Sequence, residues 1–495
     1  MPGVLVEGVR VWGFVGGCGG EILEEVTLNG ASPLAAWASP RLINYLMFPN
    51  WNFLTFRIDI FYYTSWSNLI RTMSSEFLVL DMFSGGGGLT EGFIRRSFDF
   101  VGHIEMDRNA ANTLETRLLF HNFHTDEQND LYAKYYRGVI SREEFVEMAY
   151  NTGIEKQQIT NQELSDSANA SIILDVKKQL KKKYNRKSVD VIIGGPPCQS
   201  YSLAGRGKNG KKTHNDPRNY LYKYYLHFLE VFQPDLFVFE NVPGLISAKK
   251  GTIYNDVICR CADAGYHLDQ SPHILNSSDF EVTQERERII FIGWKKKYKH
   301  LSYPEFSKKK PEGTVMDLLA DLPPLQAGEG RDEFQRYNKG RPSKYLLDKK
   351  IRNGMGGIRH HLARKHNDRD REIYRIAINK WNDSSTRLNY NELQEKLKTH
   401  RNRTSFLDRY KVVDGKSYSH AVLAHLAKDG HYFIHPDINQ ARSLTVREAA
   451  RIQSFPDDYL FEGPRSAKYV QIGNAVPPLM AEGIAERIEG MLNEI

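Results

Sequence analysis

Cys198 stands in an unusual setting, the stretch Gly194-Gly-Pro-Pro-Cys-Gln-Ser200. Proline restricts φ and biases the residue before it towards an extended conformation, so the two prolines fix the position of the thiol. A buried, inert side chain is the usual interpretation of a lone cysteine. A core thiol, however, needs neither a proline brace nor the polar residues that follow. Because a thiol with a pKa of about 8.5 is only slightly ionised at neutral pH, a nucleophile here requires a general base or a local positive field.

Two further motifs could supply that acid–base and charge support. Glu240 opens the turn Glu-Asn-Val-Pro-Gly directly after an apolar run. Gln284, Arg286 and Arg288 occupy alternate positions at the entrance to another apolar run, so they are expected on one face of a strand. Taken singly, these motifs are equally well explained as a strand-end turn and a surface ion-pair ladder. Together they are expected to bring one carboxyl group and two guanidinium groups to the same edge of a sheet as the Cys198 thiol.

A glycine loop with a following acid indicates a ligand site. Phe83-Ser-Gly-Gly-Gly-Gly88 joins an apolar run to a helical stretch, and Glu105 ends the next apolar run. Glycines at such a junction let the backbone approach a ligand, and an acid at the next strand end suits ribose hydroxyls. The loop lacks both the GxGxxG pattern and the Lys-Ser/Thr pair of a phosphate-binding loop. We therefore expect a nucleoside cofactor without a pyrophosphate; the alternative is a flexible turn beside an exposed glutamate.

The elements that must position these residues alternate in type. Short apolar runs, each bounded by turn residues, cover 77–81, 100–105, 189–193, 236–239 and 288–293. Helical patterns lie between them, at 110–119 and 220–232. This alternation predicts an α/β fold with a doubly wound, mostly parallel sheet. In such a sheet ligands bind beyond the carboxyl ends of the strands, where all three motifs are expected.

Composition and cysteine content limit the classes of protein to which this chain can belong. The chain has 495 residues, 41% apolar and 26% charged, as in an ordinary globular protein of two or three domains. Its four cysteines form no disulfide framework, and the Cys259-x-Cys261 pair lacks zinc-knuckle spacing, so we expect a reduced, intracellular setting without a metal. The most apolar stretch, 42–56, contains Pro49 and is too short to span a bilayer, and no secretory signal is expected.

Charge is placed unevenly along the chain. Residues 301–440 hold 27 lysines and arginines against 18 acids, and half of the 16 histidines. A local basic excess indicates a polyanion partner, although a solvated, loop-rich surface explains it as well.

The pattern also suggests domain boundaries. Residues 1–72 are aromatic-rich and aperiodic, and one hypothesis is that Met73 is the natural start. The expected parts are an N-terminal extension (1–72), a catalytic domain (73–299) with a polar helical insertion near 120–188, a second, smaller, irregular domain (300–440), and a segment (441–495) that completes the catalytic domain.

In order along the chain, these motifs resemble those of the DNA (cytosine-5) methyltransferase family, over most of residues 76–295 and 441–495. The matching stretches are Phe83-Ser-Gly-Gly-Gly-Gly88, Gly195-Pro-Pro-Cys-Gln-Ser200, Glu240-Asn-Val-Pro-Gly244, Gln284-x-Arg-x-Arg288, Arg442-Ser-Leu-Thr-Val-Arg-Glu-Ala-Ala-Arg-Ile-Gln-Ser-Phe-Pro456 and Gln471-Ile-Gly-Asn-Ala-Val-Pro-Pro478. The resemblance implies the methyltransferase fold, S-adenosylmethionine as methyl donor and S-adenosylhomocysteine as product. The cofactor-binding residues that it implies are Phe83, Gly85, Gly87, Glu105, Asp175, Pro197 and Asn474.

The resemblance also implies a covalent mechanism. Cys198 would add to C6 of a cytosine flipped out of the duplex, which activates C5 for methyl transfer. Glu240 would protonate or hydrogen-bond N3, and Arg288, with Arg286 behind it, would hold O2 and favour the thiolate.

Residues 300–440 would then be the target-recognition domain. Contacts to DNA are expected from Ser200, Gln284, Arg364 and Lys365, and the cluster His360, His361, Arg364, Lys365 and His366 suits phosphates or base edges. The expected partners are double-stranded DNA and, in a restriction–modification system that protects host DNA, a restriction endonuclease for the same site. A cytoplasmic, nucleoid-associated monomer follows. The alternatives are a tRNA cytosine-5 methyltransferase of the same family and a catalytically silent DNA-binding homologue; a nicotinamide-dependent oxidoreductase is disfavoured by the missing GxGxxG.

Overall fold

The computed structural model describes residues 10–11, 26–27, 77–197, 220–338, 340–353 and 355–495. The chain divides into two compact units, Met1–Leu69 and Ile70–Ile495. In the first unit, β1 (Arg10–Val11) and β2 (Val26–Thr27) pair antiparallel. All other described elements belong to the second unit.

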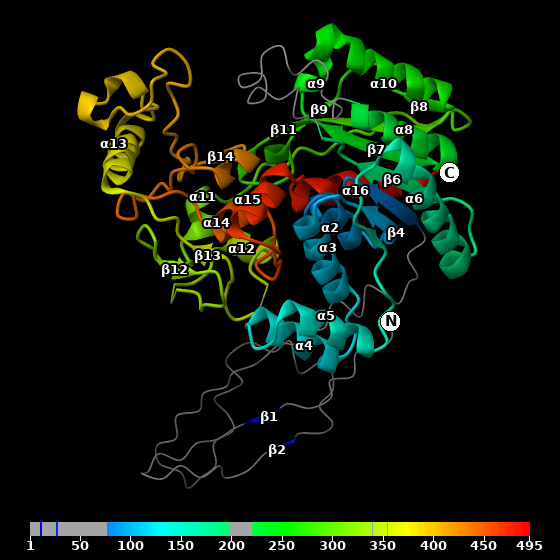
Figure 1. Ribbon diagram of the computed structural model, residues 1–495, viewed down its shortest axis with the longest axis horizontal. Coiled ribbons are helices and arrows are strands. Elements are labelled where there is room, and N and C mark those ends of the chain that lie inside the picture. Colours follow the sequence, from blue (N-terminus) through cyan, green and yellow to red (C-terminus); the bar gives the residue numbers. More distant parts are fainter. Residues whose placement is uncertain (1–9, 12–25, 28–76, 198–219, 339, 354) are drawn as a thin grey trace, which may run out of the picture. The chain divides into compact units, whose positions relative to one another are not determined.

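An eight-stranded, mostly parallel sheet forms the centre of the second unit (Figure 1). Its order is β5-β4-β3-β6-β7-β11-β8, and β9 pairs with β11 beside this path. The parallel strands are β3 (Leu78–Met82), β4 (Asp99–Ile104), β5 (Ile159–Thr160), β6 (Val191–Gly194) and β7 (Leu236–Asn241). The antiparallel strands are β8 (Tyr266–Leu268), β9 (Ile274–Asn276) and β11 (Glu287–Lys295). The predicted doubly wound sheet is confirmed, with its switch point between β3 and β6.

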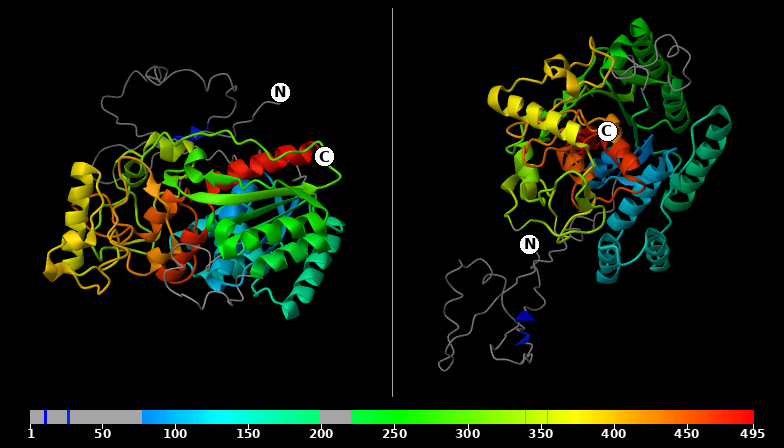
Figure 2. Two further views of the ribbon diagram at one scale, coloured as in Figure 1. Left: turned by 90° about the horizontal axis from the view of Figure 1, so that it is seen from above. Right: turned by 60° about the vertical axis from the view of Figure 1, so that its left-hand side comes forward.

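Helices cover both faces of this sheet. On one face pack α6 (Asp166–Gln179), α8 (Leu221–Phe232) and α10 (Thr252–Asp263). On the other pack α2 (Gly88–Arg95) and α16 (Pro478–Asn493), although almost 400 residues separate the two helices in sequence. Figure 2 shows α16 on one side of the strands and the α8–α10 layer on the other.

Alternation along the strands explains this layering. Leu80 and Ile192 belong to the α6–α8 cluster, whereas Val79 and Val191 belong to the α16 cluster. Successive side chains of a strand point to opposite faces, so a strand that is buried on both faces reads as a continuous apolar run. This is why the apolar runs in the sequence predict the central strands well.

Residues 120–188 contain the predicted helices but are not wholly an insertion. Helices α4 (Asp126–Tyr136) and α5 (Arg142–Asn151) each begin with a capping box. The remainder supplies β5 and α6, which belong to the sheet and its helical layer. Helix α3 (Arg108–His121) precedes this segment.

Residues 300–440 are rich in loops. Besides the single 3-10 turns Tyr390–Glu392, Glu395–Leu397 and Ala424–Ala427, the described part of this segment forms the helices α11 (Val315–Leu319), α12 (Lys344–Asp348) and α13 (Asp368–Ser384). Its short strands are β12 (Gly330–Arg331), β13 (His361–Leu362) and β14 (Ser419–His420), of which β14 pairs with β10 (Gln284–Glu285). One apolar cluster joins parts of this segment to α14 (Val446–Ile452) and α15 (Arg465–Asn474). A second cluster surrounds α13. Residues 441–475 therefore share a core with the loop-rich segment, whereas α16 packs on the sheet.

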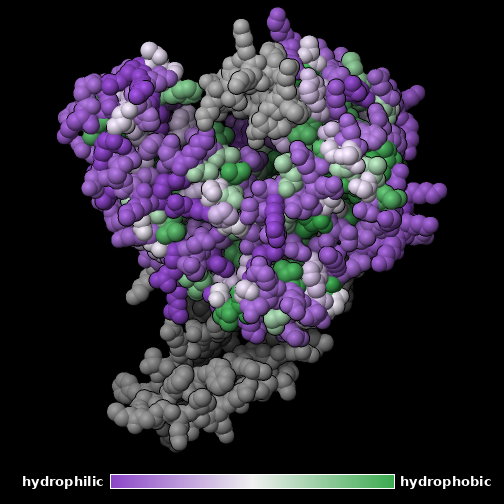
Figure 3. All heavy atoms as spheres, viewed as in Figure 1, coloured by the Kyte–Doolittle hydropathy of each residue, from purple (hydrophilic) through white to green (hydrophobic). Residues whose placement is uncertain are grey.

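The surface view shows apolar residues scattered among hydrophilic ones (Figure 3). In the described ranges, no helix is sufficiently long and apolar to cross a bilayer.

Candidate active site at the carboxyl ends of the strands

The glycine loop follows β3 at the switch point of the sheet. Phe83, Gly85 and Gly87 have φ values of 57°, 57° and 80°, which is the left-handed region. A Cβ on Gly87 would lie 2.5 Å from the hydroxyl oxygen of Tyr459, so this side of the loop has no space for a side chain. A Cβ on Gly85 would meet only the Phe83 carbonyl oxygen, at 4.0 Å. The loop is thus closely packed at Gly87 and open at Gly85, as a ligand cradle requires.

Glu105 lies directly beside this loop, as the sequence predicts. Its Oε2 accepts a hydrogen bond from the Gly85 backbone N–H at 2.8 Å, and its Oε1 accepts one from the Asp107 N–H at 2.7 Å. Burial raises the pKa of the carboxyl group. After β5, the Asn161 side-chain amide donates to the carbonyl oxygens of Glu105 and Met106 at 2.9 and 3.0 Å. Two neighbouring strand ends therefore hold Glu105 in one orientation.

Asp81 is a candidate that the sequence analysis missed. It is fully buried in β3, and its Oδ2 accepts a hydrogen bond from the Thr90 hydroxyl at 2.6 Å. Its Oδ1 is also buried and has no hydrogen-bond partner within the described part of the chain. Burial raises the pKa of Asp81 to about 7. The sequence signal that could have revealed Asp81 was a single acid inside an apolar run. A carboxylate oxygen without a hydrogen-bond partner, next to a glycine loop, suits a cationic or hydrogen-donating ligand.

Glu240 and Arg288 form an ion pair at the carboxyl end of β7. Antiparallel pairing sets Glu240 opposite Ile290, which brings the start of β11 to this edge. The Arg288 Nε lies 2.6 Å from the Glu240 Oε1, and both residues are buried. The stretch 194–200, here called the cysteine loop, begins beside the same carboxylate. A Cβ on Gly195 would lie 2.4 Å from the Glu240 Oε2, and the Asn241 amide donates to the Pro196 carbonyl oxygen at 3.1 Å.

Cys198 and Ser200 lie outside the described residues. Pro197, which precedes Cys198, is half-buried. Strand β6 ends at Gly194, which pairs with Met82 on one side and with Phe239 on the other. The cysteine loop therefore leaves the sheet between the glycine loop and Glu240.

Gln284 and Arg286 are built into the interior. Gln284, Arg286 and Arg288 are buried, while the intervening Glu285 and Glu287 are exposed, which matches the predicted alternation. The alternation shows which side chains face inward, and their hydrogen-bond partners show which segments they hold together.

The guanidinium of Arg286 donates to the carbonyl oxygens of Val422 and Gly473 at 2.7 and 2.9 Å. The side-chain amide of Gln284 donates to the Gln453 Oε1 at 2.9 Å. Both residues thus tie the strand to segments from the last 75 residues, and Gln284 does not lie on a surface that DNA could contact.

The last two predicted cofactor residues differ in position. Asn474 is exposed at the end of α15. The chain that follows Asn474 lies against the glycine loop, because a Cβ on Gly88 would be 2.2 Å from the Val476 carbonyl oxygen. Asp175 does not join this group. It lies in the middle of α6, faces solvent and pairs with Lys178 at 3.1 Å. The Ile-Leu-Asp-Val pattern belongs to an amphipathic helix and not to a strand end.

The predicted basic cluster at 360–366 is wrong for its histidines. Burial lowers the pKa of His360 to about 3 and that of His361 and His366 to about 4, so all three are neutral at pH 7. Arg364 donates to the carbonyl oxygens of residues 426–428, whereas Lys365 is exposed. Of these five residues, only Lys365 is exposed, and Arg364 is half-buried.

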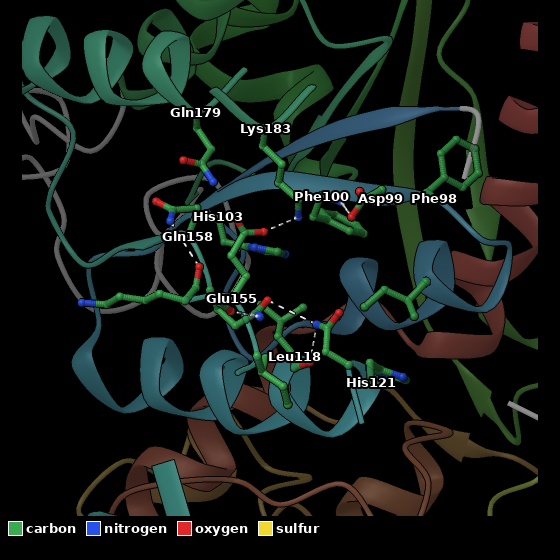
Figure 4. A pocket seen from close by; sticks show the side chains of 15 residues that line it. Phe98, Asp99, Phe100, His103, Leu118, His121, Glu155, Gln158, Gln179 and Lys183 are labelled. Carbon is green, nitrogen blue, oxygen red and sulfur yellow. Dashed lines mark hydrogen bonds and ion pairs between the residues drawn. The ribbon is translucent and has the colours of Figure 1, made fainter. Parts of the chain in front are cut away.

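A separate pocket of about 100 Å³ lies beside β4 (Figure 4). Phe100 and His103 of β4, Leu118 of α3, Gln158 and Lys183 are among the residues that line it. None of its lining residues belongs to the groups above, so it is not part of the candidate active site. Across the described ranges, no cluster of three or more His, Cys, Asp or Glu side chains is arranged to hold a metal ion.

Comparison with known proteins gives a consistent result. Residues 143–490 match the family model described as C-5 cytosine-specific DNA methylase. The chain is 40% identical over 443 residues to the type II methyltransferase M.Bpa9945I of Bacillus paralicheniformis, an alignment that covers 84% of this chain and 99% of the relative. It is 30% identical over 444 residues to the type II methyltransferase M.DdeI of Desulfomicrobium norvegicum, covering 84% and 89%.

The fold is also found among solved structures. A crystal structure described as a DNA modification methyltransferase of an Escherichia coli prophage superimposes with a TM-score of 0.58 at 24% identity, covering 84% of this chain and all of the other.

Proposed function

Since this chain belongs to the C-5 cytosine-specific DNA methylase family, and is a DNA (cytosine-5) methyltransferase of the type II restriction–modification kind, we propose that it methylates C5 of a cytosine flipped out of double-stranded DNA. The observation that carries this proposal is the buried Glu240–Arg288 ion pair, against which the cysteine loop begins.

The residue types at this edge suit the chemistry. Cytosine C5 is too weak a nucleophile to take a methyl group unaided. A bond from the Cys198 sulfur to C6 places negative charge on the ring, and a proton or hydrogen bond from Glu240 to N3 disperses it. Arg288 orients the Glu240 carboxyl through the 2.6 Å contact, and its guanidinium would donate a hydrogen bond to O2 of the same base. After methyl transfer a base removes the C5 proton, and the C6–S bond breaks to release Cys198.

The fit of the chain to S-adenosylmethionine is good at the glycine loop. That cofactor supplies an electrophilic methyl group on a sulfonium centre when it is bound. Asp81, with an orphaned buried oxygen, and Glu105 provide carboxylates for a cationic ligand with ribose hydroxyls. The further residues that would hold it are Phe83, Gly85, Gly87, Pro197 and Asn474. Asp175 is left out because it faces solvent on α6.

For target recognition we propose the loop-rich segment 300–440. Lys365, Arg375 and Arg401 are exposed and, among the residues whose positions are given, have no carboxylate partner. Such free cations suit DNA phosphates. Arg364 and Gln284, by contrast, hold the protein's own backbone and side chains together and act on DNA only through this framework. The proposed biological role is to methylate, and so protect, host DNA in the cytoplasm against a restriction endonuclease with the same target.

A covalent trap tests the proposal. In DNA that carries 5-fluorocytosine at the target, the fluorine replaces the proton that must leave C5, so the enzyme should stay bonded to the base. With S-adenosylmethionine, the wild-type protein should form an adduct that survives denaturation and is seen by mass spectrometry. Cys198→Ser should form none while still binding DNA. Cys259→Ser, at an exposed free cysteine, is the matched control and should form the adduct normally. Methylation without any adduct would refute the covalent step.

A further inference from the structure

The glycine loop is held from outside the sheet by the segment 455–461, which follows α14. The hydroxyl of Tyr459 donates a hydrogen bond to the Gly86 carbonyl oxygen at 2.7 Å, and Tyr459 is only 1% exposed. The amide on the other side of the same peptide, the Gly87 N–H, donates to the Ser84 carbonyl oxygen at 3.0 Å. Because a peptide unit is planar, these two bonds together set its orientation.

Arg117 of α3 makes a second connection between the loop and this segment. Its Nε and Nη2 donate to the two carboxylate oxygens of Glu91 at 2.8 and 2.7 Å, and its Nη1 donates to Asp458 at 2.9 Å. Glu91 lies in the first turn of α2, directly after the glycines. The Arg117 guanidinium also lies 4.8 Å from the centre of the Tyr459 ring. All of these groups are buried, so the arrangement is protected from solvent screening.

The other side of segment 455–461 is anchored to the loop-rich segment. Asp457 accepts hydrogen bonds from Arg451 at 2.6 Å and from the Tyr337 hydroxyl at 2.8 Å. Arg451 also donates to Asp321 at 2.5 Å. Tyr459 is therefore the end of a buried framework that begins in residues 321–337 and reaches the glycine loop.

We propose that Tyr459 is a positioning residue for the cofactor site, an inference that rests on S-adenosylmethionine binding at the glycine loop. Its hydroxyl holds the Gly86–Gly87 peptide in the one orientation that keeps the Gly85 side open. Glycine adopts many backbone conformations at little cost, so a loop with this composition needs an external hydrogen bond to stay in one of them. Tyr459 itself touches neither methyl group nor base.

The experiment uses a matched pair of tyrosines. Tyr459→Phe removes only the hydroxyl bound to Gly86. Tyr469→Phe removes an equally buried hydroxyl that donates to the Leu444 carbonyl oxygen, also at 2.7 Å, within the same apolar cluster. For each purified full-length variant we would measure the Kd of S-adenosylmethionine and of S-adenosylhomocysteine by calorimetry, the Kd of duplex DNA, the Tm, and kcat and KM.

The two variants should lose similar stability but differ in cofactor affinity. Loss of a buried hydrogen bond corresponds to roughly a tenfold change in an equilibrium constant. Tyr459→Phe should therefore raise the cofactor Kd and KM about tenfold, with DNA affinity unchanged. Tyr469→Phe should lower the Tm as much as Tyr459→Phe does, but it should leave the cofactor Kd within about twofold of the wild-type value. An unchanged cofactor Kd in Tyr459→Phe, or an equal rise in both variants, would overturn the proposal. A wild-type protein that binds no S-adenosylmethionine would instead refute the cofactor site itself.

A double-mutant cycle tests the contact itself, because the strain of a side chain at Gly87, with its φ of 80°, is present in both backgrounds. Gly87→Ala places a Cβ against the Tyr459 hydroxyl. If that contact matters, Gly87→Ala should weaken cofactor binding less in the Tyr459→Phe protein than in the wild type. Strict additivity of the two effects would count against a direct contact.

Discussion

At the scale of single residues, the candidate active site depends on which polar groups are buried and what they contact. Glu105, Glu240 and Arg288 were predicted from motifs, and the structure places each at a strand end. Asp81 was missed because one acid inside an apolar run reads as the end of a strand. The histidines at 360–366 were misjudged for the opposite reason, since their sequence neighbours are charged while His360 and His361 are buried and His366 is half-buried. Spacing reveals which face of a strand a residue occupies, but not how deeply that face is covered.

Asp81 predicts a pH dependence of stability. Its folded-state pKa, raised to about 7 by burial, lies above the ordinary value of 3.8. Between these values the folded protein binds the proton more tightly than the unfolded chain, so the stability from Asp81 is complete below about pH 4 and is lost as the pH rises towards 7. Urea unfolding of cofactor-free protein between pH 4 and 8 measures this slope. Asp81→Asn should remove the part of the slope that Asp81 contributes.

Comparison of the two proteins at each pH isolates this effect from the buried histidines, which titrate identically in both. Parallel stability curves for the wild type and Asp81→Asn would show that Asp81 is not protonated as inferred.

At the scale of secondary-structure elements, the sequence predicted the central strands and the helices α3 and α8 to within a few residues. Strands that are buried on both faces form unbroken apolar runs, which is a strong local signal. The antiparallel direction of β11 and the place of α6 in the main core were not predicted. Both depend on which element packs against which, and a local pattern does not contain that information.

The contact between α2 and α16 can be tested with two glycines. A Cβ on Gly92 of α2 would lie 2.4 Å from the Ala481 Cβ and from the backbone nitrogen of Glu482. Gly92→Ala should therefore force the helices apart and reduce the free energy of unfolding by about 1–3 kcal/mol. In α16, a Cβ on Gly490 meets nothing within 4 Å, so Gly490→Ala should stabilise the protein by up to about 1 kcal/mol. Denaturant unfolding distinguishes the two signs, and a stabilising Gly92→Ala would contradict the close packing.

At the scale of the whole molecule, the loop-rich segment shares an apolar cluster with α14 and α15, and we propose different functions for this segment and for the sheet. The basic excess of residues 301–440 indicated a polyanion partner or a solvated surface, and the family resemblance implied that this segment is a target-recognition domain. Apart from α13 its elements are short, and buried arginines of residues 442–451 hold its loops by their carbonyl oxygens: Arg442 donates to Leu325, Arg447 to Arg359 and Arg451 to Leu318. Sequence periodicity is uninformative for such a segment, which is why the target DNA sequence was not predicted.

A chimera tests whether residues 300–440 determine the target sequence. Replacing residues 300–440 with those of a type II relative should transfer that relative's target sequence, as read by 5-methylcytosine sequencing of DNA from expressing cells. Because residues 315–358 share an apolar cluster with α14 and α15, this chimera should have a lower Tm than either parent. Extending the exchange through residue 475 should restore the Tm. An unchanged target sequence in both chimeras would place recognition elsewhere.

The position of α16 in the chain has a consequence for how the enzyme is made. This helix covers the sheet beside α2, yet its residues are translated almost 400 positions later. Until they leave the ribosome, a nascent chain exposes the apolar face formed by Val79, Val191, Val238 and Ile290. The parallel strands can pair earlier, but one side of their core is completed only by α16. Methylation would therefore begin only after α16 has been synthesised, and until then the exposed apolar face makes the growing chain prone to aggregation.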